Sequence, residues 1–437
     1  MSEYVDIKIN SLSLYSFRNY LNSDIFGFFF QKMDLEITPD CIDDPNDEDS
    51  VKYTRYSFKT TVKKAKERLD ARGFSLLSLE EKFNNNIFTA IDYSSFLSYL
   101  KVPYDEYEEK SKKRIEKYVT FQKWKNSMHK IIYYELNNGE IKWNKKADTR
   151  EVKINTECDK VIFYSLKEYE SESFYGINLE VIPISFVFRL ILENCHSEEE
   201  ITLDITPLMG WSYESIDEVL NNIKEPEKTI VLVEGTTDKD ILEFSMSKLY
   251  PHIIDLFYFM DFDDNCGAKR DGGSSFLVKN LKTFYFSKIK SQFIAIFDND
   301  AEGYQSKCTL LREIAKWPNN FRILLYPEIK EFSKYPTIAP NGEIVEDNIN
   351  NKACSIELYL PDRLIMKDGE FYAIEWESRK KIKDEKGDEI ALYQGVILNK
   401  NIIISDFYTL RNKIEEFNEN EWKRMKTVLD SIVYAFT

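Results

Sequence analysis

The sequence predicts an α/β protein: a parallel sheet with helices on both faces, preceded by an α+β N-terminal domain and followed by a small α+β C-terminal extension. Between residues 229 and 327, short apolar runs alternate with helical patterns, which is typical of βαβ units. The chain has 437 residues, too many for one compact core. The polar segment 222–228 contains a proline and predicts a domain boundary. We therefore expect domains at 1–225, 228–330 and 331–437.

The N-terminal half shows mixed patterns. Apolar–polar alternation predicts strands, and apolar residues at helical spacing predict helices. The expected elements are a strand at 4–16, a basic helix at 55–71 that ends at Gly73, a long charged helix from Pro103 to about Glu135, a few strands within 150–182, a buried helix at 186–194 and a strand at 201–208.

After the boundary the pattern becomes regular. Four β-branched or aromatic runs predict strands at 229–233, 255–262, 292–297 and 321–327. Helical patterns between them predict helices up to Leu249, at 272–286, and up to about Lys316. This order is the one expected for a parallel sheet.

The charge distribution bears on possible partners. The net charge of −16 repels phosphate on average, so a nucleic acid would need local basic patches. Residues 52–72 and 110–130 each carry eight basic residues interleaved with aromatic ones, although solvated helix faces would look the same. The candidate nucleic-acid-binding residues are Arg55, Lys63, Lys64, Lys66, Lys112, Lys113 and Arg114.

Other features favour the cytoplasm. The six cysteines are scattered and form no CxxC pair, which is typical of reduced thiols. The N-terminus lacks the basic and apolar regions of a signal peptide, and no apolar run is long enough for a membrane span. We expect a cytoplasmic protein without a membrane partner.

Four carboxylates follow the predicted strands. Glu234 comes directly after the first strand, and Asp298 and Asp300 come after the third. Because ligands bind at the carboxyl ends of parallel strands, these side chains should meet at one edge, and Asp238 can point back toward them from the next helix. Crowded carboxylates need cations, and oxygen-only ligands favour Mg²⁺ or Mn²⁺, here two ions. Isolated acidic turns that merely cap helices are the alternative interpretation.

The two acidic motifs carry a family resemblance. LVEGTTDKDIL followed by AIFDNDAEGY resembles the Toprim (Rossmann-like) signature of primases, topoisomerases and nucleases of the OLD (overcoming lysogenization defect) type. The chain also resembles a bacterial family with an N-terminal HEPN/Toprim-associated domain. The resemblance implies a metal-dependent endonuclease, often in anti-phage defence. It makes Glu234, Asp238, Asp298 and Asp300 metal ligands, Glu234 a base for the attacking water, and Glu357 a further ligand.

Further residues could contact the scissile phosphate. Gly272 and Gly273 open a predicted helix, whose free amides could bind phosphate. Lys279 and Lys400 are candidate phosphate contacts, with Lys400 also a candidate catalytic residue, but ordinary surface lysines would look the same.

Three other functions stay open. Arg189 and His196 have the spacing of a metal-independent HEPN ribonuclease, although Leu190 departs from that pattern. A nucleotidyl-transfer enzyme of primase or topoisomerase kind and a non-catalytic Toprim adaptor are the other two. No GxxxxGK[ST] motif is present, so an ATPase or sensor would have to be a partner in trans, and a homo-oligomer is another arrangement.

Overall fold

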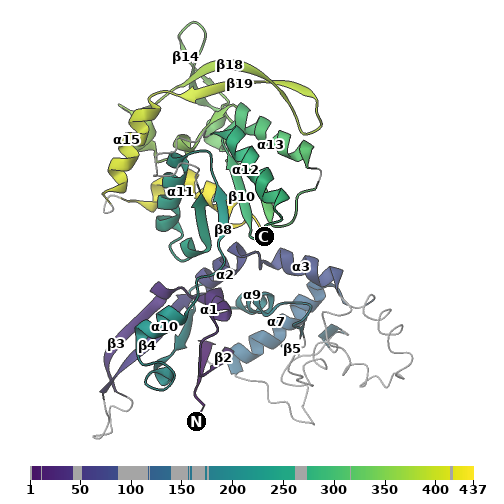
Figure 1. Cartoon of the computed structure of the whole chain (residues 1–437), viewed down its shortest axis with the longest axis vertical. Helices are drawn as coiled ribbons and strands as arrows, with labels where there is room; N and C mark the ends of the chain where they lie inside the picture. Colours follow the sequence, from purple (N-terminus) through teal and green to yellow (C-terminus); the bar gives the residue numbers. More distant parts are fainter. Residues whose placement is uncertain are drawn as a thin grey trace. The chain divides into compact units, whose positions relative to one another are not determined.

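The computed structural model describes residues 2–10, 12–42, 52–86, 117, 119–138, 156, 158–159, 173–174, 177–260, 273–314, 316–413 and 417–437. The chain divides into two compact units, one from the N-terminus to Pro226 and the other Glu227–Phe436 (Figure 1). Within the described residues, every helix is too short or too polar to cross a membrane.

The first unit is built on a five-stranded antiparallel sheet. Its order is β2-β1-β7-β4-β3, with β1 Tyr4–Ile9, β2 Leu12–Arg18, β3 Leu35–Ile42, β4 Lys52–Thr61 and β7 Glu200–Asp204. The helices are α1 Ser23–Phe29, α2 Val62–Ala71, α3 Leu76–Asn85, α7 Phe121–Asn138, α9 Ile184–Leu192 and α10 Ile216–Asn222, and a small hairpin pairs β5 Ser173–Phe174 with β6 Ile177–Asn178. Phe26, Phe58 and Phe188 belong to the shared core of sheet and helices.

Two predicted elements of this unit are wrong. The strand expected at 4–16 is a hairpin, because Asn10 adopts a left-handed conformation with φ of 53° and reverses the chain. The helix expected at 55–71 is strand β4 followed by helix α2. Tyr and Thr residues favour the strand, and the Thr61 hydroxyl caps the helix by accepting from the Lys64 amide at 3.4 Å. The predicted end at Gly73 is confirmed by its φ of 81°.

The C-terminal part of the long charged helix expected from Pro103 is confirmed as α7. Helix α7 starts at Phe121, and the Thr120 hydroxyl accepts from the Lys123 amide at 3.3 Å, as an N-cap does. Most of the predicted stretch before Thr120 lies outside the described residues. The buried helix and the following strand are confirmed as α9 and β7.

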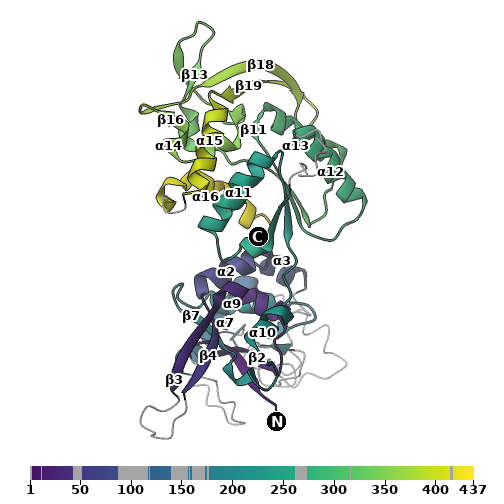
Figure 2. The same ribbon diagram turned by 60° about the vertical axis from the view of Figure 1, so that its left-hand side comes forward.

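The second unit contains the predicted parallel sheet. Its order is β12-β10-β8-β9, with β8 Thr229–Leu232, β9 Phe257–Met260, β10 Phe293–Phe297 and β12 Phe321–Leu325, all parallel. The connecting helices are α11 Thr236–Leu249, α12 Ser274–Phe286 and α13 Ala301–Glu313. Each residue of β10 is buried, as expected of a strand that is covered on both faces. Helices α12 and α13 cover one face, and α11 lies on the other (Figures 1 and 2).

Residues 331–436 belong to the same compact unit. Their strands are β13 Tyr335–Ile338, β14 Ile344–Asp347, β15 Ala353–Cys354, β16 Met366–Lys367, β17 Glu370–Phe371, β18 Ile374–Lys383 and β19 Glu389–Ile397, and their helices are α14 Asp362–Ile365, α15 Lys400–Arg411 and α16 Lys423–Val433. Helices α15 and α16 pack against α11, and the hairpin β18–β19 lies over α13 (Figure 1). The short strand β11 Asn299–Asp300 pairs with β15.

Candidate functional site

Glu234 and Asp298 meet at the carboxyl edge of the parallel sheet. They follow β8 and β10, which are neighbouring strands in parallel register. The backbone amide of Asp298 donates a hydrogen bond to Glu234 Oε1 at 3.3 Å. The sheet thus brings these two predicted site residues together.

Asp238 lies in the first turn of α11, which begins directly after Gly235. The Tyr326 hydroxyl, which follows β12, donates to Asp238 Oδ1 at 3.4 Å. A Cβ at position 235 would be 3.4 Å from the carboxylate of Asp238, an ordinary van der Waals contact, so this acid lies close beside the chain at Gly235. Asp238 therefore sits between the ends of β8 and β12.

Asp300 is engaged by the protein on both carboxylate oxygens. It is the N-cap of α13, and Oδ1 accepts from the Gly303 amide at 2.7 Å. Oδ2 accepts from Gln394 Nε2 of β19 at 2.6 Å. A Cβ at Gly303 would overlap the carbonyl oxygen of Asp298, so only glycine permits this turn. Asp300 thus holds the loop in shape, and its further use as a metal ligand would add to these contacts.

Glu357 and Lys400 form an ion pair. Glu357 is 1% exposed, in the short 3-10 helix Ile356–Tyr359, and Lys400 opens α15. Lys400 Nζ lies 3.1 Å from Glu357 Oε1, and about half of the lysine side chain is exposed. Lys400 thus places a positive charge beside the buried acids while part of its side chain reaches solvent.

The electrostatics show an excess of negative charge. Burial, and then the charge of Asp238, raise the pKa of Glu234 to about 8. Burial, and then the charge of Glu357, raise the pKa of Asp238 to about 7. Burial and Glu234 raise the pKa of Asp298 well above its usual range. Burial lowers the pKa of Lys400, but Glu357 and Asp298 outweigh this and raise it. One lysine does not balance these acids, so the arrangement favours added cations.

The donor set suits a hard divalent cation, since all the donors are oxygens. Asp298 Oδ1 and Glu357 Oε2 are buried and have no hydrogen-bond partner among the described residues, which a bound cation would satisfy. However, the described residues contain no group of three or more His, Cys, Asp or Glu side chains already gathered closely enough to hold an ion. An ion would therefore have to draw the side chains together.

The predicted phosphate contacts include Gly272, Gly273 and Lys279. The Gly273 amide donates to the Glu234 carbonyl at 3.2 Å, so this amide is used within the protein. Lys279 lies on the exposed face of α12, opposite buried Leu277 and Leu281. Gly272 lies outside the described residues.

The basic patch of the first unit is partly neutralised. Arg55 lies 3.5 Å from Asp204, and Lys66 lies 2.9 Å from Glu193. Lys63 and Lys64 are exposed in the first turn of α2. The remaining candidates, Lys112, Lys113 and Arg114, lie outside the described residues.

Arg189 and His196, the two residues of the alternative HEPN ribonuclease site, lie in different surroundings. Arg189 is 8% exposed and pairs with Asp70 at 2.7 Å and Glu193 at 2.8 Å. His196 is exposed beyond the end of α9. The arginine is thus held in a buried ion-pair network, which favours a structural role.

Three residues near the acids were missed from the sequence. Tyr326 could have been found, because it is the last residue but one of the fourth predicted strand, 321–327, at the same sheet edge. Burial and the charge of Asp238 raise its pKa well above the usual range, so it stays a donor. Glu302 accepts from Ser274 Oγ at 3.0 Å, and no sequence signal pointed to it or to Gln394.

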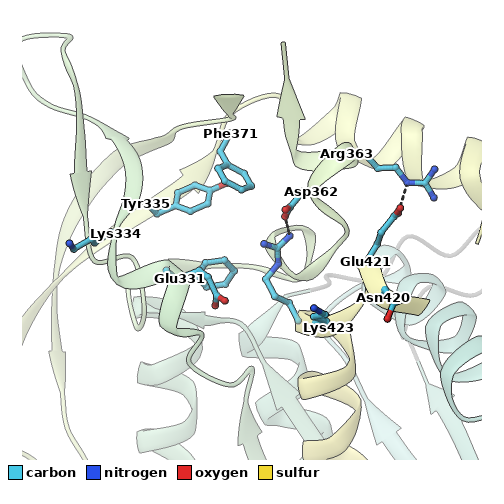
Figure 3. A pocket seen from close by; sticks show the side chains of 11 residues that line it. Glu331, Lys334, Tyr335, Asp362, Arg363, Phe371, Asn420, Glu421 and Lys423 are labelled. Carbon is cyan, nitrogen blue, oxygen red and sulfur yellow. Dashed lines mark ion pairs between the residues drawn. The ribbon is translucent and has the colours of Figure 1, made fainter. Parts of the chain in front are cut away.

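A separate pocket of about 600 Å³ lies in the C-terminal segment (Figure 3). Two ion pairs line it, Arg363 with Glu421 at 2.9 Å and Arg424 with Asp362 at 2.7 Å. The lining includes none of the acids described above. This pocket is therefore not the place where those acids would act.

Comparisons with known proteins agree with the resemblance of the N-terminal half. No curated protein and no solved structure matches the chain. The family described as HEPN/Toprim N-terminal domain 1 matches residues 1–227, more than half of the 437 residues. This chain therefore belongs to the HEPN/Toprim N-terminal domain 1 family.

Proposed function

We propose that the chain is a divalent-metal-dependent endonuclease of Toprim, OLD-like type that hydrolyses phosphodiester bonds of DNA or RNA. Family membership supports a nucleic-acid-related, nuclease-like function. The observation that carries the proposal is the hydrogen-bonded approach of Glu234 and Asp298 at the carboxyl edge of a parallel sheet. The excess of acid charge around them supports the same conclusion.

Glu234, Asp238, Asp298 and Glu357 would hold Mg²⁺ or Mn²⁺, and Asp300 would orient their loop. The ions would supply an activated water and neutralise charge on the leaving oxygen. Cations bound beside Glu234 would keep its carboxylate ionised, so that it could take a proton from the attacking water. Lys400, which is paired with Glu357 and partly exposed along its side chain, would pair with a phosphate oxygen.

The setting is part of the proposal. We propose action in the bacterial cytoplasm, in anti-phage defence, as the resemblance to the bacterial family with an N-terminal HEPN/Toprim-associated domain implies. Because the chain lacks a GxxxxGK[ST] motif, an ATPase or sensor would act in trans or the chain would assemble with copies of itself.

The test is incubation with single-stranded DNA, duplex DNA and RNA in Mg²⁺, Mn²⁺ or EDTA. We expect cleavage in the metals alone, with 5′-phosphate and 3′-hydroxyl ends. Glu234→Gln and Asp298→Asn should lose roughly 10²–10⁴-fold in rate. Asp406→Asn, an exposed acid on α15, is the matched control and should cleave normally.

Other outcomes would support other functions. Incorporation of labelled nucleotides would indicate nucleotidyl transfer, and nucleic-acid binding without cleavage in any metal would indicate an adaptor. Full activity of both acid variants would contradict the site assignment.

A further inference from the structure

A strip of alternating cationic and aromatic side chains runs along the hairpin β18–β19. Lys352 Nζ lies 5.8 Å from the centre of the Trp376 ring. The Trp376 ring lies 6.0 Å from that of Tyr393, and Arg379 Cζ lies 5.9 Å from the centre of the Tyr393 ring. Tyr393 is 50% exposed, and Lys381 is exposed next along the strand. We call these five residues the hairpin strip.

The strand register explains why the strip faces solvent. Arg379 pairs with Tyr393 across the hairpin, and Lys381 comes two residues later, so the three share one face. The opposite face carries Lys380, which pairs with Glu302 of α13 at 2.9 Å. The inner face is thus used to hold the hairpin on α13, and the outer face remains open.

The strip begins beside the candidate site. Lys352 forms a backbone bridge with Asp300, and its carbonyl accepts from the Gly395 amide at 3.1 Å. The residue before Gly395 in β19, Gln394, donates a hydrogen bond to the Asp300 carboxylate. The strip therefore leads from the acids outward along the curved ribbon seen in Figure 1.

We propose that the hairpin strip binds a single-stranded segment of the nucleic acid, a proposal that rests on the proposed nuclease function. Bases would stack on Trp376 and Tyr393, which requires them to be unpaired. Phosphates would pair with Arg379 and Lys381, because a chain of net charge −16 can hold a polyanion only at local cations. The hairpin strip ends before the tip of the hairpin, where Glu389 pairs with Lys383 in the strand register.

The test is fluorescence anisotropy of labelled single-stranded and duplex oligonucleotides in EDTA, where no metal-dependent cleavage occurs. Tyr393→Ala should weaken single-strand binding roughly five- to a hundredfold, and Tyr393→Phe should retain it, since the stacking ring remains. Arg379→Glu and Lys381→Glu should weaken binding and flatten its dependence on salt. Tyr258→Ala is the matched control, because Tyr258 is 49% exposed on β9, and Lys290→Glu is the control for charge.

The possible results distinguish failure of single-strand binding by the hairpin strip from failure of the proposed nuclease function. Unchanged single-strand affinity in Tyr393→Ala overturns the strip, even if cleavage in Mg²⁺ is normal. Equal weakening of duplex binding shows a general phosphate surface and overturns the single-strand assignment. Selective loss of single-strand binding supports the strip even if no cleavage is found, a result that would count against the nuclease alone.

Discussion

Replacing Asp238 by asparagine should stabilise the metal-free protein at alkaline pH. Burial, followed by the charge of Glu357, raises the pKa of Asp238 to about 7. The unfolded chain ionises this acid near pH 3.9, so the folded state binds more protons between these two values. Stability from this group is therefore full at low pH and is lost as pH rises toward 7. Asparagine carries no charge and avoids that loss.

The magnitude follows from the difference between folded and unfolded states. A rise from about 3.9 to about 7 is worth roughly 4 kcal/mol at pH 8, and less than about 1 kcal/mol at pH 4. The carboxylate also interacts favourably with the N-terminus of α11, which returns up to about 1 kcal/mol. The net gain of Asp238→Asn in free energy of unfolding should be about 3 kcal/mol at pH 8.

Urea unfolding in EDTA at pH 4 and pH 8 measures this gain in the unit Glu227–Phe436. Mg²⁺ at 1,000 times its Kd should reverse the order of stability, because the wild type binds the ion and gains about 4.1 kcal/mol, more than the gain of the variant. Asp406→Asn should change neither value. If Asp238→Asn is no more stable than wild type at pH 8 in EDTA, ionisation of the buried Asp238 carboxyl does not destabilise the folded protein.

Three further predictions concern the loop and the alternative site. Gly303→Ala should lower the free energy of unfolding by at least about 2 kcal/mol, since its Cβ would overlap the Asp298 carbonyl, and thermal unfolding measures this. Gln394→Ala should lower the free energy of unfolding by about 1–3 kcal/mol, because the Asp300 carboxylate loses its hydrogen bond. It should also lower the kcat for cleavage, and an unchanged kcat would show that the contact is only structural. His196→Ala should cleave at the wild-type rate, and metal-independent RNA cleavage that this variant abolishes would move the active site to the first unit.

The sequence predicted the parallel sheet well because its strands are continuous apolar runs with helices between them. It failed at β4 and α2, where the basic residues have helical spacing across both elements. The strand forms because its aromatic and β-branched side chains pair with β3 and β7, partners that local periodicity does not reveal.

The part of the candidate site that lies on the parallel sheet was predictable from the sequence, and the part that comes from the C-terminal segment was not. Glu234 and Asp298 follow neighbouring parallel strands, so a general rule places them together. Gln394 could not be found, because it contacts Asp300 from 94 residues away in a hairpin whose docking depends on tertiary packing. The pairing of Lys400 with Glu357 likewise depends on how α15 packs, not on local sequence.

That distance along the chain has a consequence for synthesis. The loop of Asp298 and Asp300 is made about a hundred residues before Gln394 and Lys400, a delay of roughly 5–20 s on a ribosome. During this interval the nascent chain carries the acids without the hairpin that fixes their loop or the lysine that would meet a phosphate. A chain that stops early would therefore lack Gln394 and Lys400, and the complete candidate site would exist only in finished molecules.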